Sequence, residues 1–263
     1  MPVLSPSAID DLRAELDERG YVVIRDVVSK TALADLRNEL VAAYDASEKF
    51  AGGGSYTGHL NCYPGKGARF TYDDIAAAGI LDLVRASKGE MADQPRATLN
   101  FNLPGSVAQH YHMDGLYLED FLVVNIAVVD TTLANGAIDV LPGTNQRFYK
   151  FWQYAVQRCY KRTTRLEMQS GDVLVRKSTL WHRGMPNTTT VPRPLMSITF
   201  GESSAPDGDP FMENDGNIRF YPNWYSTSKV SQARERLFVK APLLYSTYRF
   251  AKSLTGNRGY DKY

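Results

Sequence analysis

The spacing of hydrophobic positions predicts two helices near the beginning of this chain. Apolar residues recur every three to four positions in residues 5–19, which predicts a helix with Ser7 as its N-cap and Gly20 as its end. The same spacing in residues 30–46 predicts a second helix, with Ser29 as its N-cap. Each segment has one apolar stripe, so each helix is expected to pack one face against the body of the protein.

Several shorter segments have the composition of strands. They are rich in β-branched and aromatic residues or alternate between apolar and polar positions, and turn residues separate them. The predicted strands are residues 21–28, 98–102, 108–114, 121–129, 139–141, 172–176 and 195–200. Many short strands with turn signals between them indicate a barrel or a sandwich.

Helical spacing returns in three later segments. Residues 72–88 and 228–254 are predicted to be helical, and Pro242 divides the second of them. Residues 146–165 are aromatic and basic, and we expect a helix there too. This insert is interpreted first as a cover for one sheet face, with cations reaching to solvent. The alternative is a wall that recognises an anionic or carbohydrate substrate.

Two long segments have loop composition. Residues 51–69 are rich in Gly, and residues 202–216 are acidic and rich in Gly and Pro. Loops of this length are often functional, so both are candidate lids over a site. The alternative for the first is a plain surface connection, and for the second a disordered segment.

Length and composition exclude several classes of protein. The 263 residues carry a formal net charge of +1, so no global field would attract nucleic acid. No apolar run reaches the ~18 residues of a membrane-spanning helix. Cys62 and Cys159 are too few for a disulfide framework and are read as reduced thiols. We therefore expect a cytoplasmic protein that binds no nucleic acid.

The candidate chemistry begins with His112 and Asp114. Residues separated by one position point to the same face of a strand, so these two side chains can hold one ion together. His182, from a distant strand, would complete three ligands on one face of an octahedron. Two imidazoles and one carboxylate with open positions suit non-haem Fe(II) and O2 chemistry. The pair alone is a weak signal, and the bland interpretation is an ordinary surface or core histidine.

The surrounding motifs strengthen the metal interpretation. An Asn-Gly segment leading to Pro-Gly covers residues 135–145, a Gly-Asp strand follows at 171–175, and Trp-His with a later Asn covers 181–187. Together with the His-x-Asp-Gly at 112–115, the chain resembles the phytanoyl-CoA dioxygenase family of Fe(II)/2-oxoglutarate oxygenases over residues 9–200. It departs from the family pattern after Pro-Gly, where Thr and Asn stand in place of Ser and His.

The resemblance implies a fold class and a domain layout. The fold would be mainly β with flanking helices, around a double-stranded β-helix (jelly roll, cupin-like). We expect a single domain over residues 1–263, with N-terminal helices over about 5–47. The jelly-roll core would cover about 95–202, and a helical C-terminal extension about 225–263.

The resemblance also implies the ligands and the reaction. His112, Asp114 and His182 would bind Fe(II), and Arg193 would hold the far carboxylate of 2-oxoglutarate, since paired hydrogen bonds favour Arg over Lys. With O2, the enzyme would convert 2-oxoglutarate to succinate and CO2 while it hydroxylates an unactivated C–H bond. Halogenating relatives carry a small residue in place of Asp114, so hydroxylation is favoured. Desaturation, cyclisation and demethylation stay possible.

Further polar and aromatic residues are candidates for the rest of the site. Those expected to bind 2-oxoglutarate or orient the ligands are Gln109, Asn100, Asn125 and Thr144. Those expected to contact substrate are His110, Tyr56, His59, Tyr63 and Trp152.

Two other classes of function compete with this one. A cupin-like metal enzyme, such as an isomerase or a direct dioxygenase, would not use 2-oxoglutarate and would give Arg193 no role. A non-catalytic binding protein could also keep the barrel, although a decayed site would be expected to lose a ligand.

The substrate could be a small molecule, a lipid or a glycan-type compound. Peripheral membrane contact through the basic residues 228–254 is possible but not favoured. The sequence carries no signal for an oligomeric state.

Overall fold

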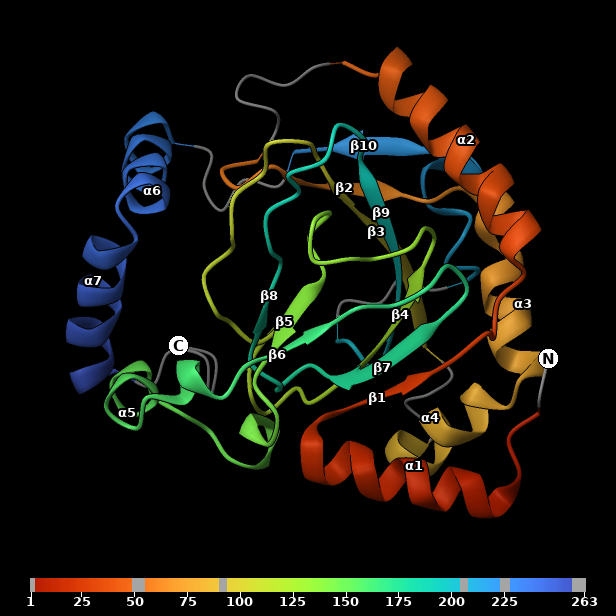
Figure 1. Ribbon diagram of the computed structural model, residues 1–263, viewed down its shortest axis with the longest axis horizontal. Coiled ribbons are helices and arrows are strands. Elements are labelled where there is room, and N and C mark those ends of the chain that lie inside the picture. Colours follow the sequence, from red (N-terminus) through yellow and green to blue (C-terminus); the bar gives the residue numbers. More distant parts are fainter. Residues whose placement is uncertain (1–2, 49–54, 90–93, 204–207, 223–227, 257–263) are drawn as a thin grey trace.

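Two antiparallel β-sheets form the centre of the molecule, and helices lie around them (Figure 1). A computed structural model describes residues 3–48, 55–89, 94–203, 208–222 and 228–256. The large sheet has the strand order β1-β7-β4-β9-β3-β2-β10 and the small sheet the order β6-β5-β8. The strands of the large sheet, in that order, are Tyr21–Ile24, Val173–Lys177, Leu122–Ala127, Arg193–Phe200, Pro95–Asn102, His59–Tyr63 and Arg219–Tyr221. Those of the small sheet are Thr164–Leu166, Ile138–Val140 and His182–Arg183.

Alternation of side chains gives the large sheet two different faces. One face is apolar and packs against the first four helices in the largest hydrophobic cluster. These helices are α1 (Pro6–Arg19), α2 (Lys30–Ala46), α3 (Phe70–Ala77) and α4 (Ile80–Lys88). On the other face, Leu174 and Leu195 pack with Ile138 of β5 and so join the two sheets. Asn125 and Arg176 share this inner face, so two polar side chains lie between the sheets.

The expected jelly-roll class is confirmed, with one difference in detail. All strand pairings within both sheets are antiparallel, and helices flank them as predicted. Within the described residues, no ladder links the small sheet to the large one. The two sheets therefore face each other without closing into a continuous barrel.

The C-terminal residues form a helical hairpin beside the small sheet. Helix α6 (Lys229–Lys240) and helix α7 (Pro242–Thr255) meet at Pro242, as the sequence predicts. Helix α7 lies against the short helix α5 (Phe151–Val156), where the Trp152 amide donates to Ser253 Oγ at 2.9 Å. Figure 1 shows this hairpin on the side of the sheets opposite to helices α2 and α3. We call α6 and α7 the C-terminal hairpin.

Local capping explains where the predicted helices begin and end. Ser29 Oγ accepts from the Ala32 amide, so α2 has its predicted cap and bounds. The prediction of Ser7 as the cap of α1 is wrong, because Ser5 accepts from the Ala8 amide and Pro6 fills the first turn. Gly20 ends α1 with φ of 84°, a left-handed conformation that glycine adopts without strain.

Other segments depart from their predicted structure. Residues 72–88 form two helices because Gly79 lies at φ of 82° between them. Residues 108–114 form no strand and contribute only an isolated bridge. The insert at 146–165 is α-helical only in α5, since Arg158 has φ of 53° and is followed by a short 3-10 turn and then by β6.

Neither candidate lid is simply a loop. Strand β2 lies within residues 51–69, of which 51–54 fall outside the described residues. Residues 204–207 of the second candidate also fall outside them.

Short 3-10 turns complete the chain at Lys66–Ala68, Thr144–Gln146, Cys159–Lys161 and Glu213–Gly216. No helix in the described part of the chain has the length and apolar run that a bilayer crossing requires.

Candidate metal centre and its surroundings

Two histidines from distant parts of the chain are held side by side by the backbone. His112 and His182 form an antiparallel bridge, with N···O distances of 3.0 Å from His112 to His182 and 2.8 Å in the reverse direction. Their ring centroids lie 4.5 Å apart. His182 opens strand β8, whereas His112 belongs to the connection between β3 and β4. The pairing therefore depends on the approach of the small sheet to this connection.

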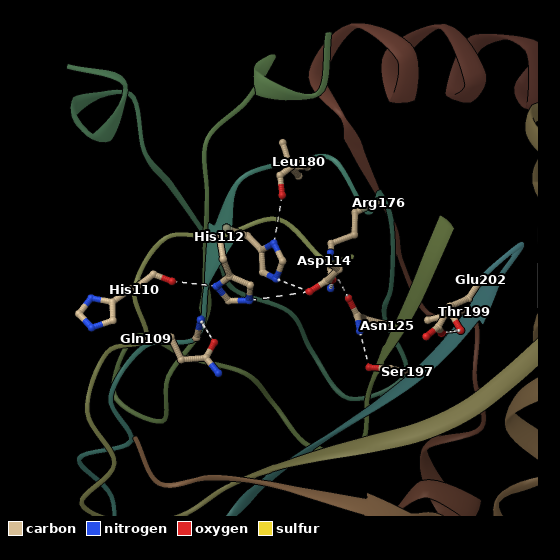
Figure 2. A network of polar contacts seen from close by, with 12 residues as sticks. Gln109, His110, His112, Asp114, Asn125, Arg176, Leu180, Ser197, Thr199 and Glu202 are labelled. Atoms are coloured by element: carbon tan, nitrogen blue, oxygen red, sulfur yellow. Dashed lines mark hydrogen bonds and ion pairs between the residues drawn. The ribbon is translucent and has the colours of Figure 1, made fainter. Parts of the chain in front are cut away.

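Each imidazole uses one nitrogen to fix its orientation. Nδ1 of His112 donates to the His110 carbonyl at 2.8 Å, and Nδ1 of His182 donates to the Leu180 carbonyl at 3.0 Å (Figure 2). A carbonyl can only accept, so Nε2 of each neutral ring carries the lone pair. Both Nε2 atoms face Asp114 Oδ1, at 3.8 Å from His112 and 3.6 Å from His182. The three donor atoms lie within 4.8 Å of one another, so they can converge on one ion.

A buried arginine holds the carboxylate in place. Arg176 Nη2 lies 2.7 Å from Asp114 Oδ2, and Arg176 Nε donates to Asn125 Oδ1 at 3.1 Å. Asn125 Nδ2 in turn donates to Ser197 Oγ at 2.7 Å. Figure 2 shows this chain of contacts crossing from β7 through β4 to β9. One carboxylate oxygen of Asp114 is thereby fixed, and the other faces the two imidazoles.

The electrostatics keep all three groups in the form that binds a metal. Burial raises the pKa of Asp114, but the charge of Arg176 outweighs this effect and holds the pKa well below its usual range. Burial and Arg176 lower the pKa of His182 to about 3. Burial also lowers the pKa of His112. At neutral pH the cluster therefore offers one anionic oxygen and two neutral nitrogens.

This donor set fits a divalent transition metal. Two imidazoles and one carboxylate are typical of non-haem Fe(II) sites that keep coordination positions open. The backbone bonds to Nδ1 and the arginine on Asp114 are outer partners of the kind that orient metal ligands. His112, Asp114 and His182 could hold such an ion without rearrangement of their hydrogen bonds.

Arg193 is a buried cation with unused donors. Its side chain lies at the start of β9 and is only 2% exposed, and Nη2 donates to the Gly136 carbonyl at 3.1 Å. Nε and Nη1 have no hydrogen-bond partner among the described residues. Burial lowers the pKa of Arg193 to about 10, so it stays charged at neutral pH. Buried donors of a charged group are costly to leave unpaired, and an anionic ligand with two oxygens would satisfy them.

His59 and Asn100 lie close to Arg193. The strand register sets His59 opposite Asn102 and Asn102 opposite Arg193, which joins β2, β3 and β9 at this end of the sheet. His59 is buried, hydrogen-bonds to Asn100, and has Nε2 3.3 Å from the Val107 carbonyl. Burial and the charge of Arg193 lower the pKa of His59 to about 4. The expected substrate contact thus sits within the sheet, beside the cation.

The remaining residues expected around the cosubstrate have different positions. Gln109 Oε1 accepts from the Gly184 amide at 2.8 Å, so it ties the connection before His112 to the segment after β8. Asn125 belongs to the chain that fixes the carboxylate. Thr144 donates to the Leu141 carbonyl and accepts from the Trp181 amide at 3.0 Å. Thr144 therefore supports the residue before His182 from behind and does not face the three donor atoms.

A cavity of about 460 Å³ extends from His112 to the C-terminal hairpin. Of the residues expected to contact substrate, Tyr56 and His110 line it, and the His110 ring lies 4.1 Å from the ring of Tyr245 in α7. Tyr63 packs against an aromatic ring of β10, and Trp152 lies at the contact between α5 and α7. Neither Tyr63 nor Trp152 is among the lining residues of this cavity.

Sequence reasoning missed Arg176. The residue stands in a strand whose other members are mostly apolar and buried, and Arg176 itself is 5% exposed. A charged side chain in such a strand requires a charged partner. This signal pointed to a carboxylate nearby, although only the fold identifies that carboxylate as Asp114.

Comparisons with known proteins agree with this geometry. Residues 16–195 match the phytanoyl-CoA dioxygenase (PhyH) family. The chain is 24% identical over 208 residues to the iron/alpha-ketoglutarate-dependent dioxygenase ausU of Aspergillus calidoustus, covering 72% of this chain and 68% of that protein. It is 25% identical over 205 residues to the methylphosphonate hydroxylase of Gimesia maris, covering 70% and 77%. Against dioxygenase af480 of Aspergillus fumigatus the identity is 26%, covering 69% of this chain and 62% of that protein.

Solved structures share the fold. The epimerase SnoN, solved with Fe3+, alpha ketoglutarate and nogalamycin RO, aligns with a TM-score of 0.59 at 17% identity, covering 86% of this chain and 98% of SnoN. EctD from S. alaskensis, solved with bound Fe, aligns with a TM-score of 0.54 at 17% identity, covering 80% and 83%. The family match covers well over half of the 263 residues and includes all three donor residues. The chain therefore belongs to the phytanoyl-CoA dioxygenase family.

Proposed function

We propose that this protein is an Fe(II)- and 2-oxoglutarate-dependent oxygenase. His112, Asp114 and His182 would hold the iron, and Arg193 would hold the distal carboxylate of 2-oxoglutarate. The observation that carries this proposal is the pair of unused buried donors on Arg193, on the inner face of the same pair of sheets. A bidentate carboxylate matches a guanidinium fork in geometry and in charge.

The residues of this chain have separable tasks in the proposed enzyme. Arg176 keeps the Asp114 carboxylate ionised and directs one oxygen to the two imidazoles. The backbone carbonyls on Nδ1 keep Nε2 of His112 and His182 free of a proton. Bound iron would supply O2 activation coupled to the oxidative decarboxylation of 2-oxoglutarate to succinate and CO2. The surrounding sheets exclude bulk water from Arg193.

We further propose that the oxidised substrate is a small molecule and that the outcome is hydroxylation of a C–H bond. The retained Asp114 supports this outcome, because a full set of three protein ligands leaves no place for a halide ligand. One relative is named a methylphosphonate hydroxylase, but structural neighbours are named an epimerase and a carbocyclase. The same iron site could therefore serve another oxidation, and the product must be identified directly. We also propose that the whole chain acts as one domain and works in the cytoplasm.

Succinate release tests the proposal. The purified protein is supplied with Fe(II), 2-oxoglutarate, O2 and a panel of candidate substrates, and succinate is measured. We expect Asp114→Ala and His182→Ala to abolish succinate production, because each removes a donor to the iron. His110→Ala should leave substantial turnover, because this histidine orients His112 through its backbone carbonyl, which the variant keeps. Its ring lines the cavity, so the loss of the ring bears on substrate binding and not on the iron donors. Undiminished turnover in either donor variant would reject the assignment.

A metal enzyme that does not use 2-oxoglutarate remains the main alternative. It predicts no role for the side chain of Arg193. In the proposed oxygenase, Arg193→Met should raise the concentration of 2-oxoglutarate needed for turnover while leaving Fe(II) binding intact. Turnover that needs Fe(II) but is indifferent to 2-oxoglutarate and to Arg193→Met would favour the alternative.

A further inference from the structure

The cavity beside His112 lies partly outside the family core. Its far wall is built by the C-terminal hairpin, which begins more than thirty residues after the family match ends at residue 195. Arg249 of α7 fastens the hairpin to the site: its Nη1 donates to the Tyr111 carbonyl at 2.7 Å, one residue before His112. The side chains that the hairpin presents are therefore features of this chain, and they bear on which molecule the cavity accepts.

Two aromatic walls face the cavity. Phe151 and Trp181 are stacked with ring centroids 6.4 Å apart on the side of the small sheet. On the side of the hairpin, Phe238 lies 5.1 Å from Tyr245 and 5.3 Å from Tyr248. All five residues line the cavity. The Arg249 guanidinium lies 4.2 Å from the ring centre of Phe151 and 5.5 Å from that of Tyr245, so it bridges the two groups. A flat ring system can pack against the ring edges and faces that remain and against this guanidinium, and such contacts gain energy beyond the burial of their area.

The charges that line the same cavity are mainly positive. Among the described residues that line the cavity, the cations are Lys150, Arg234, Arg249 and Lys252, and the acidic residue is Glu235. Glu235 is paired with Arg234 at 3.6 Å, so it does not offset the other cations. For Lys150 and Lys252, no ion pair with a carboxylate is recorded among the described residues.

These cations are separate from the residue proposed to hold 2-oxoglutarate. Arg193 does not line this cavity, whereas His112 does. The lysines therefore line the same cavity as His112 but not the surroundings of Arg193, so this cavity suits the substrate and not the cosubstrate. A negative group on the substrate would be attracted to this end of the cavity, and the rings of the substrate would lie against the aromatic side chains that line it.

We propose that the substrate is an organic anion with a flat ring body, whose carboxylate or phosphate is held by Lys150 and Lys252 between α5 and the C-terminal hairpin. This inference rests on the proposed function, since it places the substrate beside the proposed iron ligands. It assigns the C-terminal hairpin a part in substrate selection.

The experiment compares two ligands that share one ring system and differ in charge. 2-Naphthoate and its uncharged isostere 2-naphthamide are titrated by calorimetry into the full-length protein with Fe(II) and saturating 2-oxoglutarate, without O2. Saturating 2-oxoglutarate keeps naphthoate away from Arg193. We expect naphthoate to bind about tenfold more tightly than naphthamide, the effect of one charge-assisted contact with half-buried Lys150 or with exposed Lys252.

Paired variants locate the source of this preference. Lys150→Gln with Lys252→Gln should abolish the tenfold preference, and Lys150→Arg with Lys252→Arg should retain it. The matched control is Lys229→Gln with Lys240→Gln, which removes the same charge from exposed positions of α6 that do not line the cavity. That control should keep the preference.

Several results would overturn the inference: equal binding of the two ligands, no saturable binding of either at millimolar concentration, a preference that survives Lys150→Gln with Lys252→Gln, or one that the control also loses. Failure of the proposed function is distinguishable. It would show as no spectral change when 2-oxoglutarate is added to the anaerobic Fe(II) protein before the titration, whatever the naphthalene ligands then do.

Discussion

At the scale of single residues, the grouping of the three proposed ligands was predictable, whereas the residue that supports Asp114 was not. His112, Asp114 and His182 stand in motifs with fixed spacing, so the sequence alone grouped them. Arg176 has no motif of its own, and its partner follows only from the register of β4 and β7 and the approach of Asp114. Thr144 shows the opposite case, in which a residue within a motif proved to support the backbone near His182.

The first prediction concerns Arg176. Arg176→Gln should lower the affinity for Fe(II) by roughly 10–100-fold, the usual effect of losing an outer partner of a metal ligand. The physical reason is that burial then raises the pKa of Asp114 without an opposing charge, so protons compete with the metal. Isothermal titration with Fe(II) in the absence of O2 measures this change.

Arg25→Gln provides the control for Arg176→Gln. Arg25 also pairs with a buried carboxylate, Asp172, at 2.6 Å, but Asp172 is not one of the three donor residues. This variant should keep its Fe(II) affinity. Equal losses in the two variants would show that Arg176 acts through general stability and not through Asp114.

At the scale of elements, local signals predicted helices better than strands. The N-cap of α2 and the break at Pro242 depend on neighbouring residues, and both were found from the sequence. The segment 108–114 alternates like a strand, but its backbone bonds change register. Gln109 bonds to Gly184, His112 to His182, and Asp114 to Ser178, so no regular ladder forms. Only the tertiary position of the partner segment decides such a case.

The second prediction concerns the attachment of the C-terminal hairpin. Arg249 donates to the Tyr111 carbonyl, and its guanidinium lies 4.2 Å from the ring centre of Phe151. Arg249→Ala removes both contacts, so amide hydrogens of α6 and α7 should exchange several-fold faster. Exchange measured by mass spectrometry tests this. Arg236→Ala, at an exposed position of α6, should leave the exchange rates unchanged. Unaltered exchange in Arg249→Ala would show that other contacts hold the hairpin.

At the scale of the whole molecule, the site and the stability of the fold are coupled through the histidines. All four histidines of the chain, His59, His110, His112 and His182, have pKa values lowered chiefly by burial. The sequence indicated that these residues could gather at one site, but not how far each would be withdrawn from solvent. His59 and His182 are buried, whereas His110 and His112 are half-buried. These positions depend on contacts between distant parts of the chain.

The third prediction follows from the sign of these shifts. A histidine with a lowered pKa in the folded state takes up its proton more readily when unfolded, so stability falls as the pH drops below 6.5. For His59, with a pKa of about 4, the loss is complete below about pH 4 and amounts to roughly 3 kcal/mol. Urea unfolding of the metal-free protein between pH 7 and pH 4 measures this decline.

The variant His59→Gln removes the contribution of one histidine to this pH dependence of stability. The unfolding free energy of this variant should fall less steeply with decreasing pH, by about 1.4 kcal/mol per pH unit within the window between the two pKa values. The comparison uses slopes, so a constant loss of stability from the substitution does not affect it. Parallel slopes for the variant and the unaltered protein would contradict the assigned burial of His59.

The most direct test of the central claim is an anaerobic absorption titration of the protein with Fe(II) and 2-oxoglutarate. A keto acid that chelates iron at a site of two histidines and one carboxylate gives a visible charge-transfer band. We predict that the band develops only when both are present, that His182→Ala abolishes it, and that Arg193→Lys requires roughly tenfold or more 2-oxoglutarate to reach it. Absence of the band from the unaltered protein, or a band of full intensity in His182→Ala, would contradict the proposed iron centre.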